Sequence, residues 1–382
     1  MSHSKWAGRC SSCGAWNSLV ESLPASRDGA LAAVKGKKLT ATAVKKIGAE
    51  QRSERLPTNV SDVDAVLGGG SVQGSVNLIA GQPGIGKSTL LMQLAAQLSR
   101  NYSVLYVSGE ESLEQVGMRS SRIAPKDQDV LLASSTNSDD IAQTILSGDH
   151  KVVIVDSIQT ISCQNVSSAP GSVSQITNST YLLTQAAKQS GTTLILVGHV
   201  TKEGSIAGPK LLEHLVDVVL NLEGDRYGGF KVLRAVKNRY GSTAEVGIFD
   251  MTEKGLLPVA NPSAVLLAER QIADGSVVLA AMEGTRPVLV EVQALVNKTS
   301  FGYPKRAASG FDLNRLNLLT AVLTRRTKLD LSEFDVYINI VGGIKINEPA
   351  ADLAVCMAIA SAAKGMQLKD DAVVFGEVGL SG

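Results

Sequence analysis

One glycine-rich segment of the chain combines a lysine with hydroxyl side chains at the spacing G-x-x-x-x-G-K-[ST]. Glycines let a loop wrap around phosphates, because no Cβ keeps the backbone N–H groups away from them. The pattern predicts that the lysine reaches the β- and γ-phosphates of a nucleoside triphosphate and that the first hydroxyl binds Mg²⁺. The predicted site consists of Gly81, Gln82, Pro83, Gly84, Ile85, Gly86, Lys87, Ser88 and Thr89.

A carboxylate that would help to hold the magnesium ion ends the apolar segment Val152-Val-Ile-Val-Asp156. Beside a phosphate-binding loop, an Asp at the end of a buried strand joins the Mg²⁺ shell directly or through water. The alternative is an Asp that only caps the next helix. We prefer the magnesium role for Asp156, because strand ends of open α/β sheets gather where ligands bind.

Hydrolysis also requires a group that orients the attacking water, and two carboxylates follow the apolar segment that ends at Val107. We prefer Glu110 as this base. Glu111 is the weaker candidate, because an acidic residue at a helix N-terminus is also favoured by the helix dipole. His199 ends a third apolar segment at the same predicted edge, and it is either a sensor of the γ-phosphate or a structural histidine.

The elements that must position these groups are short apolar segments separated by helical patterns. The segments are continuous rather than alternating, which is typical of strands buried on both faces of a parallel sheet. We therefore predict an α/β fold with right-handed crossovers. The predicted strands are 75–80, 104–107, 152–155 and 193–197; the predicted helices are 88–98 and 211–215; and 216–222 with 230–236 would form a hairpin around Gly228-Gly229.

Changes in composition predict the domain boundaries. Residues 1–22 form a small module, and 23–55, rich in Ala, Lys and Gly, form a linker. A core follows at 56–258, and prolines at 258 and 262 separate it from a second, α+β domain at 262–382. The second domain would contain strands at 276–281, 288–296 and 373–375 and helices at 312–324 and 350–363. We expect this domain to be truncated, because the chain stops soon after its last strand begins.

Charge and composition exclude few classes of function. The 37 basic and 36 acidic residues leave a net charge of +1. This charge does not point to nucleic acid, although a local basic groove can lie on a neutral protein. No apolar run of about 18 residues predicts a membrane span, and residues 1–10 do not resemble a signal peptide. Four cysteines in 382 residues do not indicate a disulfide scaffold, so we expect a cytoplasmic protein.

Four motifs together carry a family resemblance: the glycine-rich segment, the strand that ends at Asp156, Gly109-Glu110-Glu111 and Lys237-Asn-Arg-Tyr-Gly-Ser242. They resemble the bacterial RadA (Sms) family of recombination ATPases. Residues 1–22 resemble part of its zinc-ribbon module, 56–258 its RecA-like P-loop ATPase core, and 262–382 its Lon-protease-like domain. The resemblance implies an ATP- and Mg²⁺-dependent hexameric ring. It would act as a branch-migration helicase on single-stranded DNA and branched recombination intermediates in DNA repair, with the RecA recombinase.

The resemblance also implies roles for four cations. In ring helicases, residues such as Lys237 and Arg239 act on the nucleotide of the neighbouring subunit, where an arginine finger contributes about 10³–10⁵ in rate. Composition alone would favour a solvated basic strand end. Lys202 and Lys210 would contact DNA from a channel-facing loop, with an ordinary surface loop as the alternative. Arg119 and Arg122 are weaker candidates.

Two positions depart from the family pattern. A closed structural zinc site takes four ligands, whereas residues 1–22 supply only one cysteine pair, Cys10 and Cys13. We therefore expect the chain to bind zinc poorly. In Lon-type proteases a nucleophilic Ser follows a Pro, but here Ala350 follows Pro349. We expect no protease activity, and we interpret the second domain as a scaffold for ring assembly and DNA binding.

The alternative to a helicase is a RecA-like switch in which ATP binding controls the oligomeric state and the second domain recruits partners. The segment from Lys237 to Gly241 favours the helicase through the resemblance.

Overall fold

The computed structural model describes residue 41 and residues 54–123, 129–199, 211–224, 229–268, 270–300 and 302–382. The chain divides into two units, Met1–Arg52 and Ser53–Gly382. Cys10, Cys13, Lys202 and Lys210 lie outside the described residues. The following description therefore concerns the second unit.

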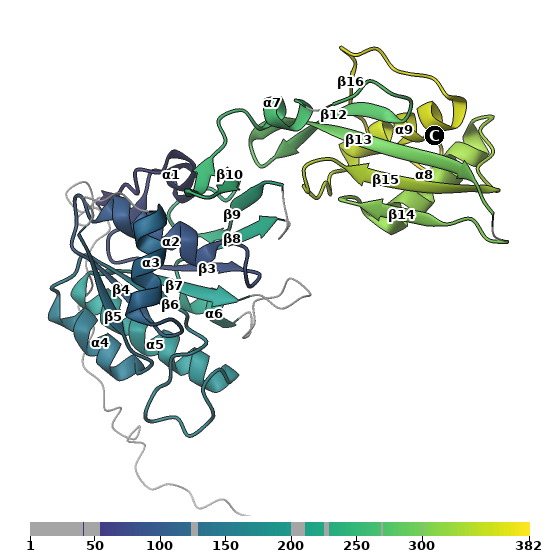
Figure 1. Cartoon of the computed structure of the whole chain (residues 1–382). Coiled ribbons are helices and arrows are strands. Elements are labelled where there is room, and N and C mark those ends of the chain that lie inside the picture. Colours follow the sequence, from purple (N-terminus) through teal and green to yellow (C-terminus); the bar gives the residue numbers. More distant parts are fainter. Residues whose placement is uncertain are drawn as a thin grey trace, which may run out of the picture. The chain divides into compact units, whose positions relative to one another are not determined.

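A nine-stranded sheet forms the first part of this unit, in the order β11-β10-β9-β8-β3-β7-β6-β4-β5 (Figure 1). Its parallel strands are β3 (Val76–Gly81), β4 (Val104–Ser108), β5 (Val130–Ser134), β6 (Val152–Asp156), β7 (Thr193–His199) and β8 (Val218–Gly224). The antiparallel strands β9 (Lys231–Asn238), β10 (Val246–Thr252) and β11 (Gly255–Pro258) extend it. The predicted α/β class with a mostly parallel sheet is confirmed.

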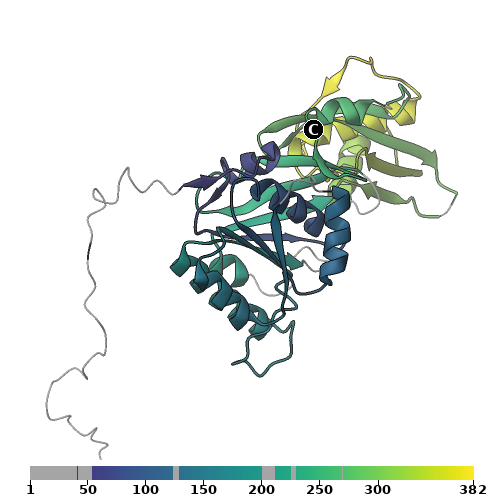
Figure 2. The same ribbon diagram turned by 60° about the vertical axis from the view of Figure 1, so that its left-hand side comes forward.

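Helices cover both faces of this sheet (Figure 2). On one face lie α1 (Ser61–Leu67), α2 (Lys87–Leu98) and α3 (Leu113–Ile123). On the other lie α4 (Ser138–Ser147), α5 (Val173–Ser190) and α6 (Leu211–Leu215). The strands between the two layers are buried on both faces, and this double burial explains their continuous apolar sequences.

Several boundaries differ from the predictions. The hairpin strand predicted from residue 216 begins at Val218, because the Val216 N–H still donates to Leu212 at the end of α6. Residue 55, assigned to the linker, lies in β1 (Arg55–Leu56), which pairs with β2 (Ser71–Val72). No pattern in the sequence predicted β5, which is only partly buried at the edge of the sheet.

The second part contains a five-stranded sheet in the order β14-β15-β13-β12-β16. These strands are β12 (Ser276–Glu283), β13 (Arg286–Lys298), β14 (Arg306–Ser309), β15 (Phe334–Ile340) and β16 (Val373–Val374). Its helices are α7 (Pro262–Leu267), α8 (Leu313–Arg326) and α9 (Asp352–Lys364). The predicted helix at 350–363 begins two residues later, because Pro349–Ala351 form a 3₁₀ turn. The predicted helix at 312–324 begins at Leu313, with Asp312 as its N-cap.

The two parts share one apolar cluster. Phe230 just before β9, Val232 of β9 and Ile248 of β10 belong to the same cluster as Val277 and Val290 of the second sheet. Two ion pairs also join the parts: Arg286 contacts Asp62 at 2.6 Å, and Arg234 contacts Glu283 at 2.8 Å. The antiparallel strands thus pack against the second sheet as well as completing the first.

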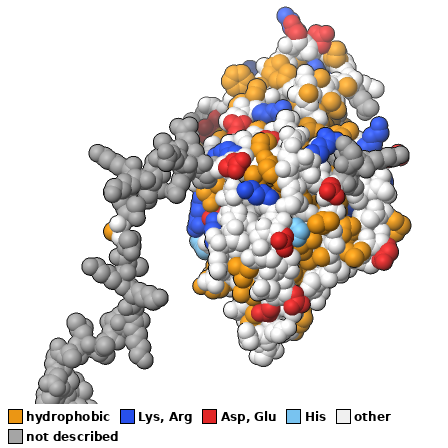
Figure 3. All heavy atoms as spheres, turned by 90° about the vertical axis from the view of Figure 1, so that its left-hand side faces the viewer, with side chains coloured by type: hydrophobic (Ala, Val, Ile, Leu, Met, Phe, Trp, Pro, Cys, Tyr) orange, Lys and Arg blue, Asp and Glu red, His pale blue; other side chains and the backbone are white. Residues whose placement is uncertain are grey.

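The surface in Figure 3 carries Lys and Arg side chains interspersed with Asp and Glu, as the balanced composition predicts. Among the helices that the structure describes, none has the length and apolar character that a membrane span requires.

Candidate active site

The loop between β3 and α2 has the backbone geometry of a phosphate cradle. Gly84 and Gly86 have φ angles of +78° and +113°, which L side chains rarely adopt. A Cβ on Gly84 would meet no atom within 4 Å, whereas one on Gly86 would lie 2.5 Å from Met251 Cε. Gly86 caps α2 without any side-chain hydrogen bond. The first N–H groups of the helix therefore remain available for an anion, and the residues present fit a polyphosphate.

Lys87 is the first residue of α2, and its ammonium lies under this loop. Its Nζ donates to the carbonyl oxygens of Gly81 at 2.9 Å and Gln82 at 3.0 Å, and lies 3.0 Å from Nδ1 of His199. Burial lowers the pKa of Lys87 to about 8, against the opposing effect of Asp156 and Glu110. A phosphate would restore the charge that burial disfavours. Ser88 and Thr89 follow in the first turn of the same helix.

Asp156 lies at the carboxyl end of β6, two strands from β3, and is buried. The Tyr106 hydroxyl of the adjacent strand donates to its Oδ2 at 2.5 Å. Burial and the charge of Asp156 raise the pKa of Tyr106, so the hydroxyl keeps the proton that it donates. The hydrogen bond holds the carboxyl group of Asp156 in one orientation, and carboxylate oxygens are ligands that magnesium takes.

The structure separates the two neighbouring carboxylates. Glu110 Oε1 accepts a hydrogen bond from the Ser157 hydroxyl and lies 3.5 Å from Nε2 of His199. Glu111 instead forms an ion pair with Arg119, and its main chain bonds to Ser108. Glu110 therefore belongs to the cluster around Lys87, and Glu111 faces α3. Arg119, a weaker DNA candidate, is held in this ion pair.

His199 connects the lysine with the glutamate. It ends β7 directly beside Gly81 of β3, so the register of the two strands places the ring next to the loop. A protonated Lys87 only donates, so Nδ1 accepts and the ring proton lies on Nε2, toward Glu110. A change at Lys87 would thus reach Glu110 through one imidazole ring.

These groups suit the hydrolysis of a nucleoside triphosphate. Magnesium, when bound, would neutralise phosphate charge, with Ser88 and Asp156 as the residues that would hold it. Lys87 would bind the terminal phosphates, and Glu110 would orient water at the partly exposed side of the cluster. Within the described residues, no group of three or more His, Cys, Asp and Glu suggests a further metal site.

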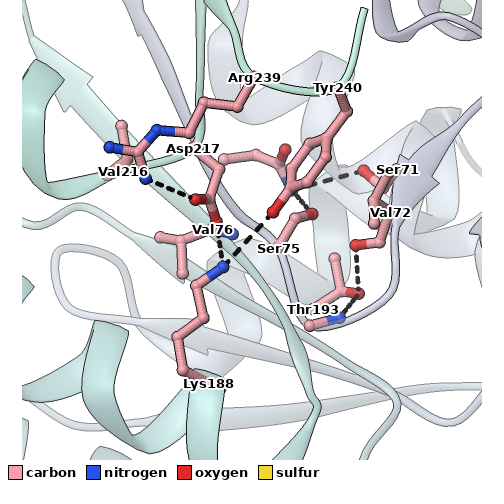
Figure 4. Close-up of polar contacts among 12 residues, drawn as sticks. Ser71, Val72, Ser75, Val76, Lys188, Thr193, Val216, Asp217, Arg239 and Tyr240 are labelled. Carbon is pink, nitrogen blue, oxygen red and sulfur yellow. Dashed lines mark hydrogen bonds and ion pairs between the residues drawn. The ribbon is translucent and has the colours of Figure 1, made fainter. Parts of the chain in front are cut away.

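Lys237 and Arg239 lie at the opposite edge of the sheet. Val218 begins β8 and pairs both with Asn77 near the start of β3 and with Asn238 at the end of β9. The end of β9 is therefore level with Asn77, which is offset from Gly81 along the strand direction by about 13 Å, for four residues of about 3.3 Å each. Lys237 donates to the carbonyl oxygens of Glu213 and Val216, at 2.5 and 2.8 Å. Arg239 contacts Asp217 at 3.0 Å (Figure 4).

Sequence reasoning missed Tyr106, Ser157 and Asp217. The signal for Tyr106 was a single hydroxyl in an otherwise apolar strand next to the strand of Asp156. Ser157 follows Asp156 directly, and its role could have been inferred from that position. No sequence pattern links Asp217 to Arg239, because 22 residues separate them.

Comparisons with known proteins agree with this site. Residues 50–205 match the model of a family described as an AAA domain, and residues 1–21 match that of the rubredoxin metal binding domain. The DNA repair protein RadA of Bacillus subtilis is 48% identical over 99% of this chain and 84% of its own length. The proteins of the same name from Listeria monocytogenes and Pseudomonas aeruginosa are 47% and 46% identical over 99% of this chain, covering 83% and 84% of their own lengths. A P-loop cluster and such extensive identity lead to one conclusion: the chain belongs to the RadA family.

Proposed function

We propose that the chain is a DNA-dependent ATPase that works as a homo-oligomeric, hexameric ring. In this proposal it acts as a branch-migration helicase on single-stranded DNA and branched recombination intermediates during DNA repair, together with the RecA recombinase. The membership of the chain in the RadA family supports the repair role. The site around Lys87 supports the ATPase.

The observation that supports the ring is the placement of the segment Lys237-Asn-Arg at the edge of the sheet opposite the phosphate loop. Arg239 cannot reach the nucleotide of its own subunit across the length of β3. It can act on a phosphate only if another subunit presents one. The guanidinium is suited to this role, since its side chain is 53% exposed.

In the proposed cycle, the loop amides and Lys87 bind the triphosphate, and Glu110 orients a water for attack on the terminal phosphate. Lys87 leaves the carbonyl oxygens of Gly81 and Gln82 when it takes up the phosphate. His199 then loses its contact with the ammonium. Because the same ring also contacts Glu110, phosphate binding changes the surroundings of Glu110 as well. Arg239 from the neighbouring subunit neutralises the charge that develops during the transfer.

The experiment that tests the proposal measures ATP turnover with and without single-stranded DNA at low salt. We expect DNA to stimulate turnover, and Lys202→Ala and Lys210→Ala to reduce the stimulation. If DNA does not change ATP turnover and the protein binds no DNA at low salt, the protein is an ATP-controlled oligomeric switch without helicase action. A strand-displacement assay on a branched substrate then separates a helicase from a DNA-stimulated ATPase without motor activity.

A mixing experiment tests the action of Arg239 across subunits. Arg239→Ala should leave ATP binding by the subunit intact and reduce turnover by about 10³. Lys87→Ala subunits hydrolyse nothing themselves but carry an intact Arg239. Adding them to Arg239→Ala subunits should therefore restore turnover at mixed interfaces. Mixtures no more active than their components would contradict the role of Arg239 in trans.

The N-terminal cysteines support only weak zinc binding in this proposal. A closed structural site takes four ligands, and the segment that matches the metal-binding family contains Cys10 and Cys13. The cysteines in the described residues, Cys163 and Cys356, are buried and free. We expect well under one zinc per chain by elemental analysis. One tightly held zinc per chain would overturn this expectation.

The C-terminal domain serves as a scaffold rather than as a protease in this proposal. The residue after Pro349 is Ala350, in the 3₁₀ turn before α9, and it has no nucleophilic oxygen. A casein-degradation assay should therefore show no activity that depends on this domain.

A further inference from the structure

Asp217 forms the centre of a charged cluster at the amino edge of the large sheet (Figure 4). It lies between α6 and β8, and its side chain is 5% exposed. One carboxylate oxygen, Oδ2, accepts from the Val76 N–H at 3.0 Å and from the Lys188 ammonium. The other, Oδ1, accepts from Nη1 of Arg239 at 3.0 Å. One buried anion therefore has two cations, and they occupy different oxygens.

The two cations are held differently. Lys188 comes from the last turn of α5, and its Nζ lies 3.5 Å from the Tyr240 hydroxyl as well as against Asp217. Arg239 uses one of its five N–H donors in the only side-chain hydrogen bond that the structure describes for it. Its side chain is also the more exposed of the two, at 53% against 44%. Arg239 is thus the cation that can leave.

The backbone around Arg239 is fixed, in contrast to its side chain. The Arg239 N–H donates to the carbonyl oxygen of Asp217 at 3.2 Å. The carbonyl oxygen of the next residue, Tyr240, accepts from Nη2 of Arg55 at 2.8 Å. Movement of the guanidinium therefore requires rotation of its side chain only, and it starts from a defined position.

We propose that Asp217 is a positioning residue for Arg239, which it holds ready until a neighbouring subunit presents a phosphate, and that Lys188 neutralises Asp217 when Arg239 leaves. This inference rests on the proposed action of Arg239 across subunits. Without a second cation, withdrawal of Arg239 would leave a buried charge unpaired, which is strongly unfavourable. With Lys188 and the Val76 N–H in place, Asp217 stays paired while the Arg239 guanidinium moves from Asp217 to the phosphate of the neighbouring subunit.

The state of Asp217 agrees with this arrangement. Burial by itself would raise the pKa of Asp217, but the hydrogen bonds from Lys188 and Val76, the charge of Lys188 and the bond from Arg239 outweigh it and lower the pKa. The carboxylate therefore stays charged at neutral pH and keeps attracting Arg239.

The test uses Asp217→Asn in the full-length oligomer with single-stranded DNA and ATP. The amide oxygen can still accept from Val76, but the charge that attracts Arg239 is removed. We expect kcat to fall about tenfold and the KM for ATP to change less than twofold, because the phosphate loop lies at the other edge of the sheet. Adding Lys87→Ala subunits, whose Asp217 and Arg239 are intact, should raise turnover per Asp217→Asn subunit severalfold. Lys188→Arg, which keeps the second cation, is the matched control and should retain turnover.

Two outcomes would overturn the inference: turnover of folded Asp217→Asn within twofold of the unmodified protein, or a loss that Lys87→Ala subunits do not rescue. If Asp217→Asn fails to fold by circular dichroism, Lys188→Gln replaces it. This variant leaves Asp217 with Arg239 alone, so kcat should fall and the same mixtures should restore it; unchanged turnover would again overturn the inference. Arg239→Ala, run in parallel, separates the two proposals. Full activity of Arg239→Ala defeats the proposed role of Arg239 itself, whereas a rescued defect in Arg239→Ala beside an unaffected Asp217→Asn defeats only the inference about Asp217.

Discussion

The two edges of the large sheet hold their charges in different ways. At the carboxyl edge, the Lys87 ammonium contacts two carbonyl oxygens and the imidazole of His199. At the amino edge, Arg239 rests on Asp217, an anion that already has a second cation. In the first arrangement the cation has no contacting anion, whereas in the second both cations, Lys188 and Arg239, share one contacting anion. In the proposed mechanism, the carboxyl edge can receive phosphate directly, whereas Arg239 at the amino edge would first have to leave Asp217.

This difference indicates how the two edges divide the work. In the proposed function, ATP binding would depend on groups within one subunit, because the loop, Lys87 and Asp156 all lie at one end of the parallel strands. Full turnover would also depend on Arg239, which a subunit cannot bring to its own nucleotide. Substitutions at the carboxyl edge should therefore act within a subunit, and the following four predictions test this side of the comparison.

The largest effect is expected for Lys87→Ala. It removes the only charged side chain in the described residues that lies directly under the phosphate loop, so we expect turnover to fall by more than about 10³ and ATP affinity to fall with it. Isothermal titration calorimetry and a phosphate-release assay measure the two effects. Lys364→Ala, at the exposed end of α9, is the control and should change neither. Persistence of both affinity and turnover in Lys87→Ala would mean that the cradle lies elsewhere.

The next largest effect is expected for Glu110→Gln, which keeps the shape of the side chain but removes the base. Turnover should fall about 10²-fold, in the range of general base catalysis, while ATP affinity stays within about twofold. Glu111→Gln is the matched control, since Glu111 pairs with Arg119 instead. A greater loss of turnover in Glu111→Gln than in Glu110→Gln would reverse the assignment of the base.

A smaller effect is expected for Tyr106→Phe, which removes the hydrogen bond to Asp156. A bond to a charged group contributes about 1.5 kcal/mol or more, so turnover at limiting Mg²⁺ should fall about tenfold. Excess Mg²⁺ should recover part of this loss. Tyr102→Phe provides the control, because Tyr102 packs against the same core without a described side-chain hydrogen bond. Equal losses in both variants would show that Tyr106 matters for packing and not for Asp156.

The smallest effect is the pH dependence of ATP binding. Because burial lowers the pKa of Lys87 to about 8, the free protein loses the ammonium proton as the pH rises through that value. Bound phosphate raises the pKa of the ammonium, so ATP binding takes up a proton at alkaline pH. The Kd for ATP should therefore rise about fivefold between about pH 8 and pH 9. Lys87→Arg, whose cation does not titrate there, should abolish the dependence; an unchanged pH profile would attribute it to another group.

Sequence patterns predicted the carboxyl edge better than the amino edge. The glycine-rich segment, Asp156, Glu110 and His199 each follow an apolar strand, and ends of parallel strands meet at one edge. The sequence favoured Glu110 over Glu111 as the base but could not decide between them. The directions of two adjacent side chains depend on the conformation of the turn after β4, which only the structure shows. Lys237 and Arg239 were recognised through the family, and the predicted hairpin of 216–222 with 230–236 placed them at the end of its second strand. Nothing local showed that this end lies level with the start of β3.

The amino-acid sequence by itself determined the P-loop, the α/β class and the family, since these depend on spacing within short segments and on strands buried on both faces. The tertiary structure alone decided which charges meet. Lys188 of α5, Asp217 before β8 and Arg239 after β9 are separated by 22 residues or more, and they meet because β8 and β9 pair in one register at the start of β3. Side chains from distant segments acquire partners only when the sheet orders its strands, and no periodicity in the sequence encodes that order.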